Sequence, residues 1–386
     1  MKSNFELAHV VRRFGKQLME QEKLSPGQAK ALYNITQCRT AALGGHEEVC
    51  ACCGHLQYSY NSCGDRHCPK CQGTKQALWV EKLIGSTLPV KHYHIIFTLP
   101  HCLNKICLWN NALFYKLLFC HVWSTLHSFG YTHYGTQTGA VAMLHTWGQN
   151  LSLHPHIHCL VPAAGYSLDG RWINIGKTGR FIYPVEQLGQ TFKGKFLCSL
   201  KRALKKMDML DAFDAYIQEA FNKDWVVFSE ASLAGADHVI KYLGQYVHRV
   251  AISNHRILNI TDSHVTFMAK DYREKALPKP VTLEGAEFLR RFCLHVLPKG
   301  TVKVRRFGIY NPTIKRNFEL RFGNETIENV KNKKKETTRE ALKRLTGFDP
   351  LICPVCNRGI MMITRELPRI RSPAMHLPTL LASILF

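Results

Sequence analysis

Acidic residues are scarce in this sequence of 386 residues. Asp and Glu together number 28 against 51 Lys and Arg, which leaves a formal net charge of +23. That excess is far larger than solubility requires, and it favours a polyanionic partner, of which nucleic acid is the most obvious. A basic solvated surface and a surface attracted to membranes are the alternative interpretations of the charge.

Long apolar runs are also missing. No uninterrupted apolar stretch approaches the roughly 18 residues of a membrane-spanning helix, and the first six residues, Met1-Lys2-Ser3-Asn4-Phe5-Glu6, lack the charged start and apolar core of a secretory signal. Internal repeats and long low-complexity linkers are absent as well. Because 46% of the residues are hydrophobic, the chain can bury a core, and its length predicts two or three domains. We therefore expect a globular, cytoplasmic protein with no membrane segment.

Cysteine, in contrast, is abundant and clustered. Among 15 cysteines, Cys50 and Cys53 form one Cys-x2-Cys pair, and Cys68 and Cys71 form another after fourteen intervening residues. This spacing is close to that of zinc sites with four cysteine ligands. We therefore expect one structural Zn²⁺ held by these four thiolates, which would fold a segment too small to be stable without it.

Three further potential ligands lie beside these pairs: His46, Cys63 and His67. Each could replace one of the four cysteines, complete a second zinc site, or simply pack. A third Cys-x2-Cys pair, or knuckle, is formed by Cys353-Pro354-Val355-Cys356, and no other such pair lies near it in the sequence. It could bind zinc through distant ligands, mediate dimerisation, or be the remnant of a site.

Histidines alternate along a predicted strand in His154-Pro155-His156-Ile157-His158. Side chains two apart on a strand share one face at a separation of about 6.6 Å, so His156 and His158 can bring two imidazoles to one metal ion. Ile157 between them points to the opposite face, into the core. Two neutral imidazoles make only half of a site, and a third ligand is needed.

Two tyrosines follow at helical spacing. Tyr242 and Tyr246 are four apart, which places both hydroxyls on one side of a helix. A tyrosine hydroxyl beside a metal-bearing strand can attack a phosphodiester and hold DNA covalently. Packing is the alternative role for such a pair.

Taken together, these motifs resemble the two-tyrosine HUH transposases of rolling-circle insertion sequences, and the likeness extends from about Gln37 to Gly308. The matching segments, in chain order, are Cys38–His46, Tyr60–Cys63, Arg66–Cys71, Phe97–Pro100, His154–Leu160, Lys241–Tyr246 and Phe292–Gly300. The resemblance implies a single-strand DNA endonuclease and strand transferase that acts on the ends of a mobile element. It implies Tyr242 and Tyr246 as nucleophiles that form a 5′-phosphotyrosine bond, with Mg²⁺ or Mn²⁺ at the histidines as the catalytic ion.

The third ligand of the catalytic ion stays open. His154 shares the strand face but lies further from His158, and Gln245 lies on the tyrosine helix. Gln149 and His238 are additional candidates. Lys241, beside the first tyrosine, could stabilise a phenolate or a phosphate.

The order of predicted elements indicates an α+β fold: an antiparallel HUH endonuclease sheet with helices, preceded by a small helical zinc-binding domain. We expect three regions, namely a helical and zinc-binding domain at 1–85, a catalytic domain at 86–300, and a basic C-terminal region with the Cys353–Cys356 knuckle at 301–386. Predicted helices are 4–22, 26–37, 106–128, 184–206, 209–222, 283–296 and one from Asn332 through Leu345. Predicted strands are 92–99, 140–147, 154–162, 225–228, 256–260, 264–268 and one around Lys303 to Arg306, with a hairpin at Leu168-Asp169-Gly170.

Two other functions remain compatible with the motifs. One is a plasmid or phage rolling-circle replication initiator, which would use the same chemistry at a hairpin origin. The other is a zinc-dependent DNA-binding protein with an inactive nuclease fold, which is disfavoured because the histidine and tyrosine motifs are both intact.

Overall fold

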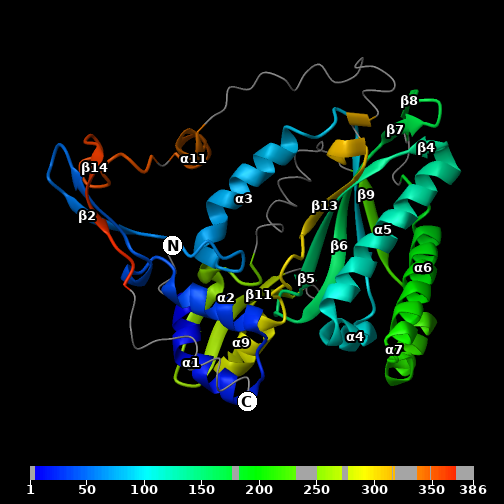
Figure 1. The fold of residues 1–386 in the computed structure, drawn as a ribbon, viewed down its shortest axis with the longest axis horizontal. Coiled ribbons are helices and arrows are strands. Elements are labelled where there is room, and N and C mark those ends of the chain that lie inside the picture. The colour runs from blue at the N-terminus through cyan, green and yellow to red at the C-terminus, as the bar shows by residue number, and fades with distance from the viewer. Residues whose placement is uncertain are drawn as a thin grey trace.

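A five-stranded antiparallel sheet forms the centre of the structure (Figure 1). The computed structural model describes residues 5–175, 182–231, 250–271, 277–314, 316, 317, 337–347 and 349–370. The strand order in this sheet is β13-β5-β6-β3-β9. The strands are β3 (His92–Thr98), β5 (Gly139–Trp147), β6 (Leu153–Pro162), β9 (Val227–Ala231) and β13 (Val304–Gly308). The predicted α+β class with an antiparallel sheet is confirmed.

Helices cover one face of this sheet, where α5 and α6 run along it in Figure 1. They are α4 (Asn104–Trp109), α5 (Asn111–Tyr134), α6 (Val185–Lys206) and α7 (Leu210–Asn222). The core between them and the sheet is apolar and aromatic. In it the rings of Phe97 on β3 and Phe192 on α6 meet edge to face at 5.1 Å.

The helix predicted over 106–128 is two helices. Asn110 separates α4 from α5, because its backbone leaves the helical region and its side-chain oxygen accepts the backbone N–H of Leu113 at the start of α5. The predicted hairpin near Leu168 is confirmed. It joins β7 (Ala164–Ser167) to β8 (Trp172–Asn174), beside the short β4 (Thr136–Gln137), and Gly170 supplies the left-handed turn residue with φ +89°.

A second core lies where the N-terminal helices α1 (Leu7–Gln21) and α2 (Pro26–Gln37) pack against a smaller sheet and helix. That sheet contains β10 (Ile257–Ile260), β11 (His264–Asp271) and β12 (Leu277–Glu284), and the helix is α9 (Gly285–Cys293). At the contact between α1 and α9, a Cβ on Gly285 would lie 2.2 Å from the ring of Phe14, so only glycine fits there. Residues 5–37 thus share a core with residues 251–296.

The predicted helix over 283–296 is shorter than expected, since residues up to Glu284 form β12, which pairs with β11. Both predicted N-terminal helices are confirmed. Ser25 begins the second one with a capping box, in which its hydroxyl accepts the N–H of Gln28 while the Gln28 side chain accepts the N–H of Ser25.

Another three-stranded sheet joins residues 45–60 to residues 361–367. Its order is β14-β1-β2, with β1 (Gly45–Cys50), β2 (Leu56–Tyr60) and β14 (Met361–Leu367). In Figure 1 this sheet extends away from the central sheet, and α3 (Pro69–Ile84) connects the two regions. Leu83 of α3 packs on the second face of the central sheet, against Val141 and Leu160.

The C-terminal helix α11 (Thr338–Thr346) starts later than Asn332, because Thr337 is an extended N-cap whose hydroxyl accepts the N–H of Glu340. Short 3-10 turns occupy Ala41–Leu43, His101–Leu103 and Asn254–Arg256. In the described parts of the chain, no helix is both long enough and apolar enough to cross a membrane.

Candidate active site and metal centres

The histidine strand lies in the middle of the central sheet, as β6 between β5 and β3. Its alternation follows the prediction. Ile157 is fully buried in the core on the helix-covered face, and His156 and His158 point to the opposite face. Both histidines are less than a tenth exposed.

A third histidine, His145, completes a cluster that the sequence motif alone did not suggest. It lies on β5 directly opposite His156 in the antiparallel ladder. Nδ1 of His145 is 2.9 Å from Nε2 of His156, and one ring nitrogen from each of His145, His156 and His158 lies within 4.8 Å of the other two. The three imidazoles can therefore converge on one ion.

Hydrogen bonding fixes how His156 presents its ring. Its Nδ1 donates to the backbone carbonyl of His154 at 2.7 Å, so Nε2 carries the lone pair that faces His145. Such a bond from the non-ligating nitrogen to a carbonyl is the usual support of a metal-bound histidine. Burial lowers the pKa of His156 to about 4 and holds the pKa values of His145 and His158 well below the ordinary value. The rings are thus neutral near pH 7, as ligation requires.

The other candidate ligands are placed differently. His154 is not in the cluster; its ring packs against His101, with centroids 5.2 Å apart. Gln149 lines the groove beside the cluster. His94 on β3 approaches from the other side, with its Nε2 2.9 Å from Nδ1 of His158 and the two rings stacked.

A groove of about 870 Å³ opens over the cluster. The three histidines and Trp147 form part of its lining, and the facing part comes from the β11–β12 hairpin and α9. That facing part carries three basic side chains: Lys270, Lys279 and Arg291. Metal-ligand chemistry and positive charge thus share one groove, which suits a phosphate backbone.

The described residues do not include the predicted nucleophiles. Tyr242 and Tyr246 lie outside the described residues, as do Lys241, Gln245 and His238. On the N-terminal side of these residues the described chain stops at Ala231, on edge strand β9, and on the C-terminal side it resumes at Val250.

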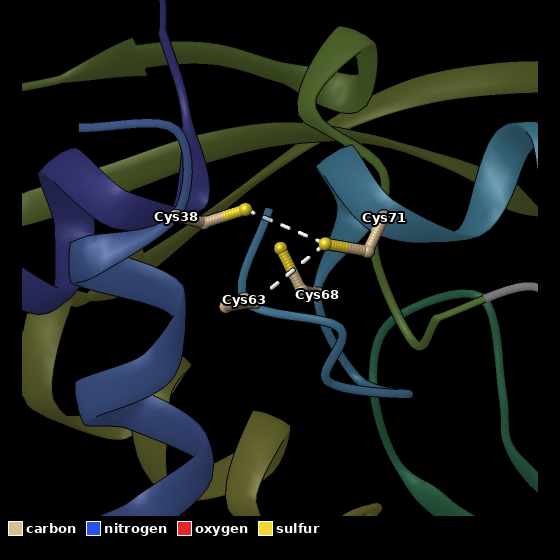
Figure 2. Close-up of side chains that lie close together, drawn as sticks. All are labelled: Cys38, Cys63, Cys68 and Cys71. Atoms are coloured by element: carbon tan, nitrogen blue, oxygen red, sulfur yellow. Dashed lines mark hydrogen bonds between the residues drawn. The ribbon is translucent and has the colours of Figure 1, made fainter. Parts of the chain in front are cut away.

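Cysteines form two clusters of four, and neither is the predicted quartet. The first contains Cys38, Cys63, Cys68 and Cys71, with ligand atoms within 4.8 Å of one another (Figure 2). The Sγ of Cys71 lies 3.4 Å from that of Cys38 and 3.6 Å from that of Cys63. Cys38 follows α2, and Cys68 and Cys71 begin α3, so this cluster ties two helices together.

The second cluster contains Cys50, Cys53, Cys353 and Cys356. The structure therefore does not bring Cys50 and Cys53 to Cys68 and Cys71. Each predicted pair finds its partners elsewhere, because Cys50 ends β1 in a sheet that extends away from the start of α3.

Of the three leftover candidates, only Cys63 joins a cluster. His67 is held by hydrogen bonds instead: its Nδ1 meets Asp65 at 3.1 Å, and its Nε2 accepts the backbone N–H of Leu297. His46 pairs with Glu48 at 3.0 Å. Both histidines thus have structural contacts outside the two cysteine clusters.

Two protein families match the parts of the chain that contain the first cysteine cluster and the histidine cluster. A family described as "Transposase zinc-binding domain" matches residues 10–99, which contain the whole first cysteine cluster. A family described as "Putative transposase" matches residues 139–317, which contain His145, His156 and His158. No solved structure matches the chain significantly.

Full-length relatives give the same result. The chain is 38% identical over 385 residues to "Putative transposase y4qJ" of Sinorhizobium fredii, covering 95% of this chain and 96% of the relative. It is 25% identical over 301 residues to the transposase for insertion sequence element IS801 of Pseudomonas savastanoi pv. phaseolicola, covering 75% of this chain and 72% of that relative. The class of protein is therefore a transposase, an enzyme that processes DNA. More narrowly, the chain belongs to the rolling-circle insertion-sequence transposases of the IS91/IS801 family and contains their structural zinc-binding domain.

Proposed function

We propose that this transposase nicks and joins single-stranded ends of a mobile element through a 5′-phosphotyrosine intermediate. The observation that carries the proposal is the convergence of His145, His156 and His158 in a groove whose facing part is basic. Three neutral imidazoles offer a metal site, and Lys270 and Lys279 offer contacts for the phosphates that flank the scissile bond.

The donor set fits a divalent cation. His145, His156 and His158 would hold it, and the hydrogen bond from Nδ1 of His156 to the His154 carbonyl leaves the lone pair of this ring on Nε2. When bound, the cation polarises the scissile phosphate and offsets the charge that accumulates on its oxygens. Imidazole ligands suit Mn²⁺ better than Mg²⁺, so we expect Mn²⁺ to support the reaction at lower concentration.

Tyrosine supplies the nucleophile in this proposal. The oxygen of Tyr242 or Tyr246 forms a bond to phosphorus, and the bond between phosphorus and the 3′ oxygen breaks. The phenolic proton is lost, and the departing 3′ oxygen takes up a proton to become a free hydroxyl. The phosphotyrosine bond keeps the energy of the broken linkage, so a 3′-hydroxyl can later reverse the step without an external energy source. A second tyrosine allows a second strand end to be held before the first is released.

The first cysteine cluster is our candidate for the structural zinc of the zinc-binding domain. Cys38, Cys63, Cys68 and Cys71 all lie inside the matched range 10–99. We propose these four thiolates as its ligands, in place of the quartet expected from spacing.

Strand preference tests the proposal. Oligonucleotides carrying an element end should be cut with Mn²⁺ when single-stranded and left intact as a duplex, giving a free 3′-hydroxyl on one product. The variant His156→Ala/His158→Ala should bind the single strand but not cut it, because the affinity comes mainly from distributed positive charge. Preferential cutting of the duplex would contradict the proposal.

A replication initiator is the alternative with the same chemistry. Both named relatives are transposases, and no contact among the described residues favours the initiator. An inactive DNA-binding protein is equally unsupported, since the structure assembles the histidines into a potential metal site.

A further inference from the structure

The second cysteine cluster joins parts of the chain that are remote in sequence. The Sγ atoms of Cys53 and Cys353, 300 positions apart, are separated by 3.7 Å, and those of Cys50 and Cys356 by 3.7 Å. Four thiolates bound tetrahedrally at about 2.3 Å place neighbouring sulfurs about 3.8 Å apart. The observed spacing therefore matches a tetrathiolate ion site and is far longer than the roughly 2.05 Å of a disulfide.

The two Cys-x2-Cys segments adopt equivalent turns. In the first, the N–H of Gly54 donates to the carbonyl of Cys50 at 3.1 Å, and in the second, the N–H of Asn357 donates to the carbonyl of Cys353 at 3.0 Å. Gly54 and Asn357 both have a left-handed backbone, with φ +68° and +54°. Each turn thus aims two thiols to the same side.

Backbone N–H groups also point at the sulfurs. Cys52 and Cys53 direct theirs to Sγ of Cys50 at 3.4 and 3.5 Å, and Gly359 directs its own to Sγ of Cys356 at 3.3 Å. Such donors stabilise thiolate, the form of cysteine that binds metal.

Direct contact locks the two turns together. The N–H of Ala51 donates to the carbonyl of Ile360 at 3.0 Å, and β14 continues from there as the antiparallel partner of β1. A Cβ on Gly359 would lie 2.4 Å from Sγ of Cys50, so the second turn fits against the first only with glycine at this position.

We propose that Cys50, Cys53, Cys353 and Cys356 hold a second structural zinc ion, which fastens the C-terminal segment to the zinc-binding domain. Cys353 and Cys356 lie outside both family matches, which end at residues 99 and 317. The ion closes a loop of 300 residues, and a cross-link over so long a loop restricts the unfolded chain strongly. The pairing of Arg344 on α11 with Glu81 on α3, at 2.8 Å, adds a second connection between the same two regions.

Cobalt substitution of the full chain tests the proposal, with Co²⁺ alone as the probe. Thiolate ligands give a sulfur-to-cobalt charge-transfer band, and the histidine cluster does not contribute to it. Titration of this band in chains that carry His156→Ala/His158→Ala, so that the histidine cluster takes up no cobalt, should saturate at two equivalents per chain with intact cysteines. Cys353→Ser/Cys356→Ser should saturate at one, and so should Cys38→Ser, which removes a ligand of the first cluster. Saturation at one equivalent with all cysteines intact, or at two in Cys353→Ser/Cys356→Ser, would overturn the proposal.

Cys52 offers a matched control within the same turn, because it is exposed and stands outside the cluster. Cys52→Ser should keep two equivalents; loss of one there would refute the ligand assignment. The fastening role has its own readout in amide hydrogen exchange of residues 361–367. Exchange there should accelerate in Cys353→Ser/Cys356→Ser and stay slow in Cys38→Ser, whereas unchanged exchange in the double variant would exclude that role. These results do not depend on the histidines or on DNA cleavage.

Discussion

His145 and His156 lie directly opposite each other on neighbouring antiparallel strands, with ring nitrogens 2.9 Å apart. This pairing turns a two-histidine motif into a three-histidine cluster. The first histidine of the motif, His154, does not join this cluster, and its ring packs against His101 instead.

Removal of His145 should weaken the catalytic ion site. We expect His145→Ala to raise the dissociation constant for Mn²⁺ by more than about tenfold, since even loss of a residue that only supports a ligand typically costs 10–100-fold. Electron paramagnetic resonance of free Mn²⁺ during titration measures this directly. His154→Ala is the matched control and should bind Mn²⁺ like the wild type. Equal Mn²⁺ affinities of the wild type, His145→Ala and His154→Ala would show that His145 is not a ligand of the ion.

Basic residues of the groove should contribute to DNA affinity through phosphates. Lys270→Ala/Lys279→Ala should weaken single-stranded DNA binding and flatten the plot of log affinity against log salt by roughly 1.4, at about 0.7 for each phosphate that a lysine no longer neutralises. Fluorescence anisotropy over a series of salt concentrations gives the slope. Lys116→Ala, an exposed lysine on α5, serves as the control. An unchanged slope in the double variant would show that the DNA passes elsewhere.

Buried neutral histidines should make stability depend on pH. Burial lowers the pKa of both His92 and His295 to about 4. Because the unfolded chain takes up protons below pH about 6.5 and the folded chain does so only near 4, stability is full above 6.5 and is lost as the pH falls through this window.

The expected loss is about 2 kcal/mol for each of these histidines between pH 7 and pH 5. Urea unfolding at several pH values measures it. His295→Gln should show a smaller loss than the wild type over the same range, and thiol protonation at the cysteine clusters affects both proteins alike. Identical pH profiles would contradict the buried, neutral state of His295.

Local patterns were enough to predict much of the fold. Alternation along residues 154–162 predicted β6 (Leu153–Pro162) and its two faces, and Ser25-Pro26 predicted the start of α2. Helix ends that depend on a single side chain, such as the break at Asn110, were missed because no change in hydrophobic period marks them. The strand β12 was not predicted, and its last two residues were assigned to a helix, because its pairing with β11 is a tertiary contact.

The metal clusters show the same division. Each Cys-x2-Cys pair was recognisable in the sequence, but the pair with which it shares a cluster was not. Spacing along the chain does not show where the fold places each Cys-x2-Cys turn. Cys50 meets Cys356 only because β14 pairs with β1 across more than 300 positions. His145 was on a predicted strand, but its register against His156 could not be read from the sequence.

Covalent capture of DNA tests the central claim most directly. The protein, incubated with Mn²⁺ and a labelled single strand carrying a cognate element end, should form an adduct that survives denaturation. Tyr242→Phe/Tyr246→Phe should abolish the adduct, because phenylalanine keeps the ring and removes only the attacking oxygen. Tyr131→Phe, at an exposed tyrosine of α5, should leave it intact. Either single variant at the paired tyrosines should retain partial cleavage and lose completed strand transfer. A double-phenylalanine protein that still forms the adduct at the wild-type level would contradict the assignment of Tyr242 and Tyr246 as nucleophiles.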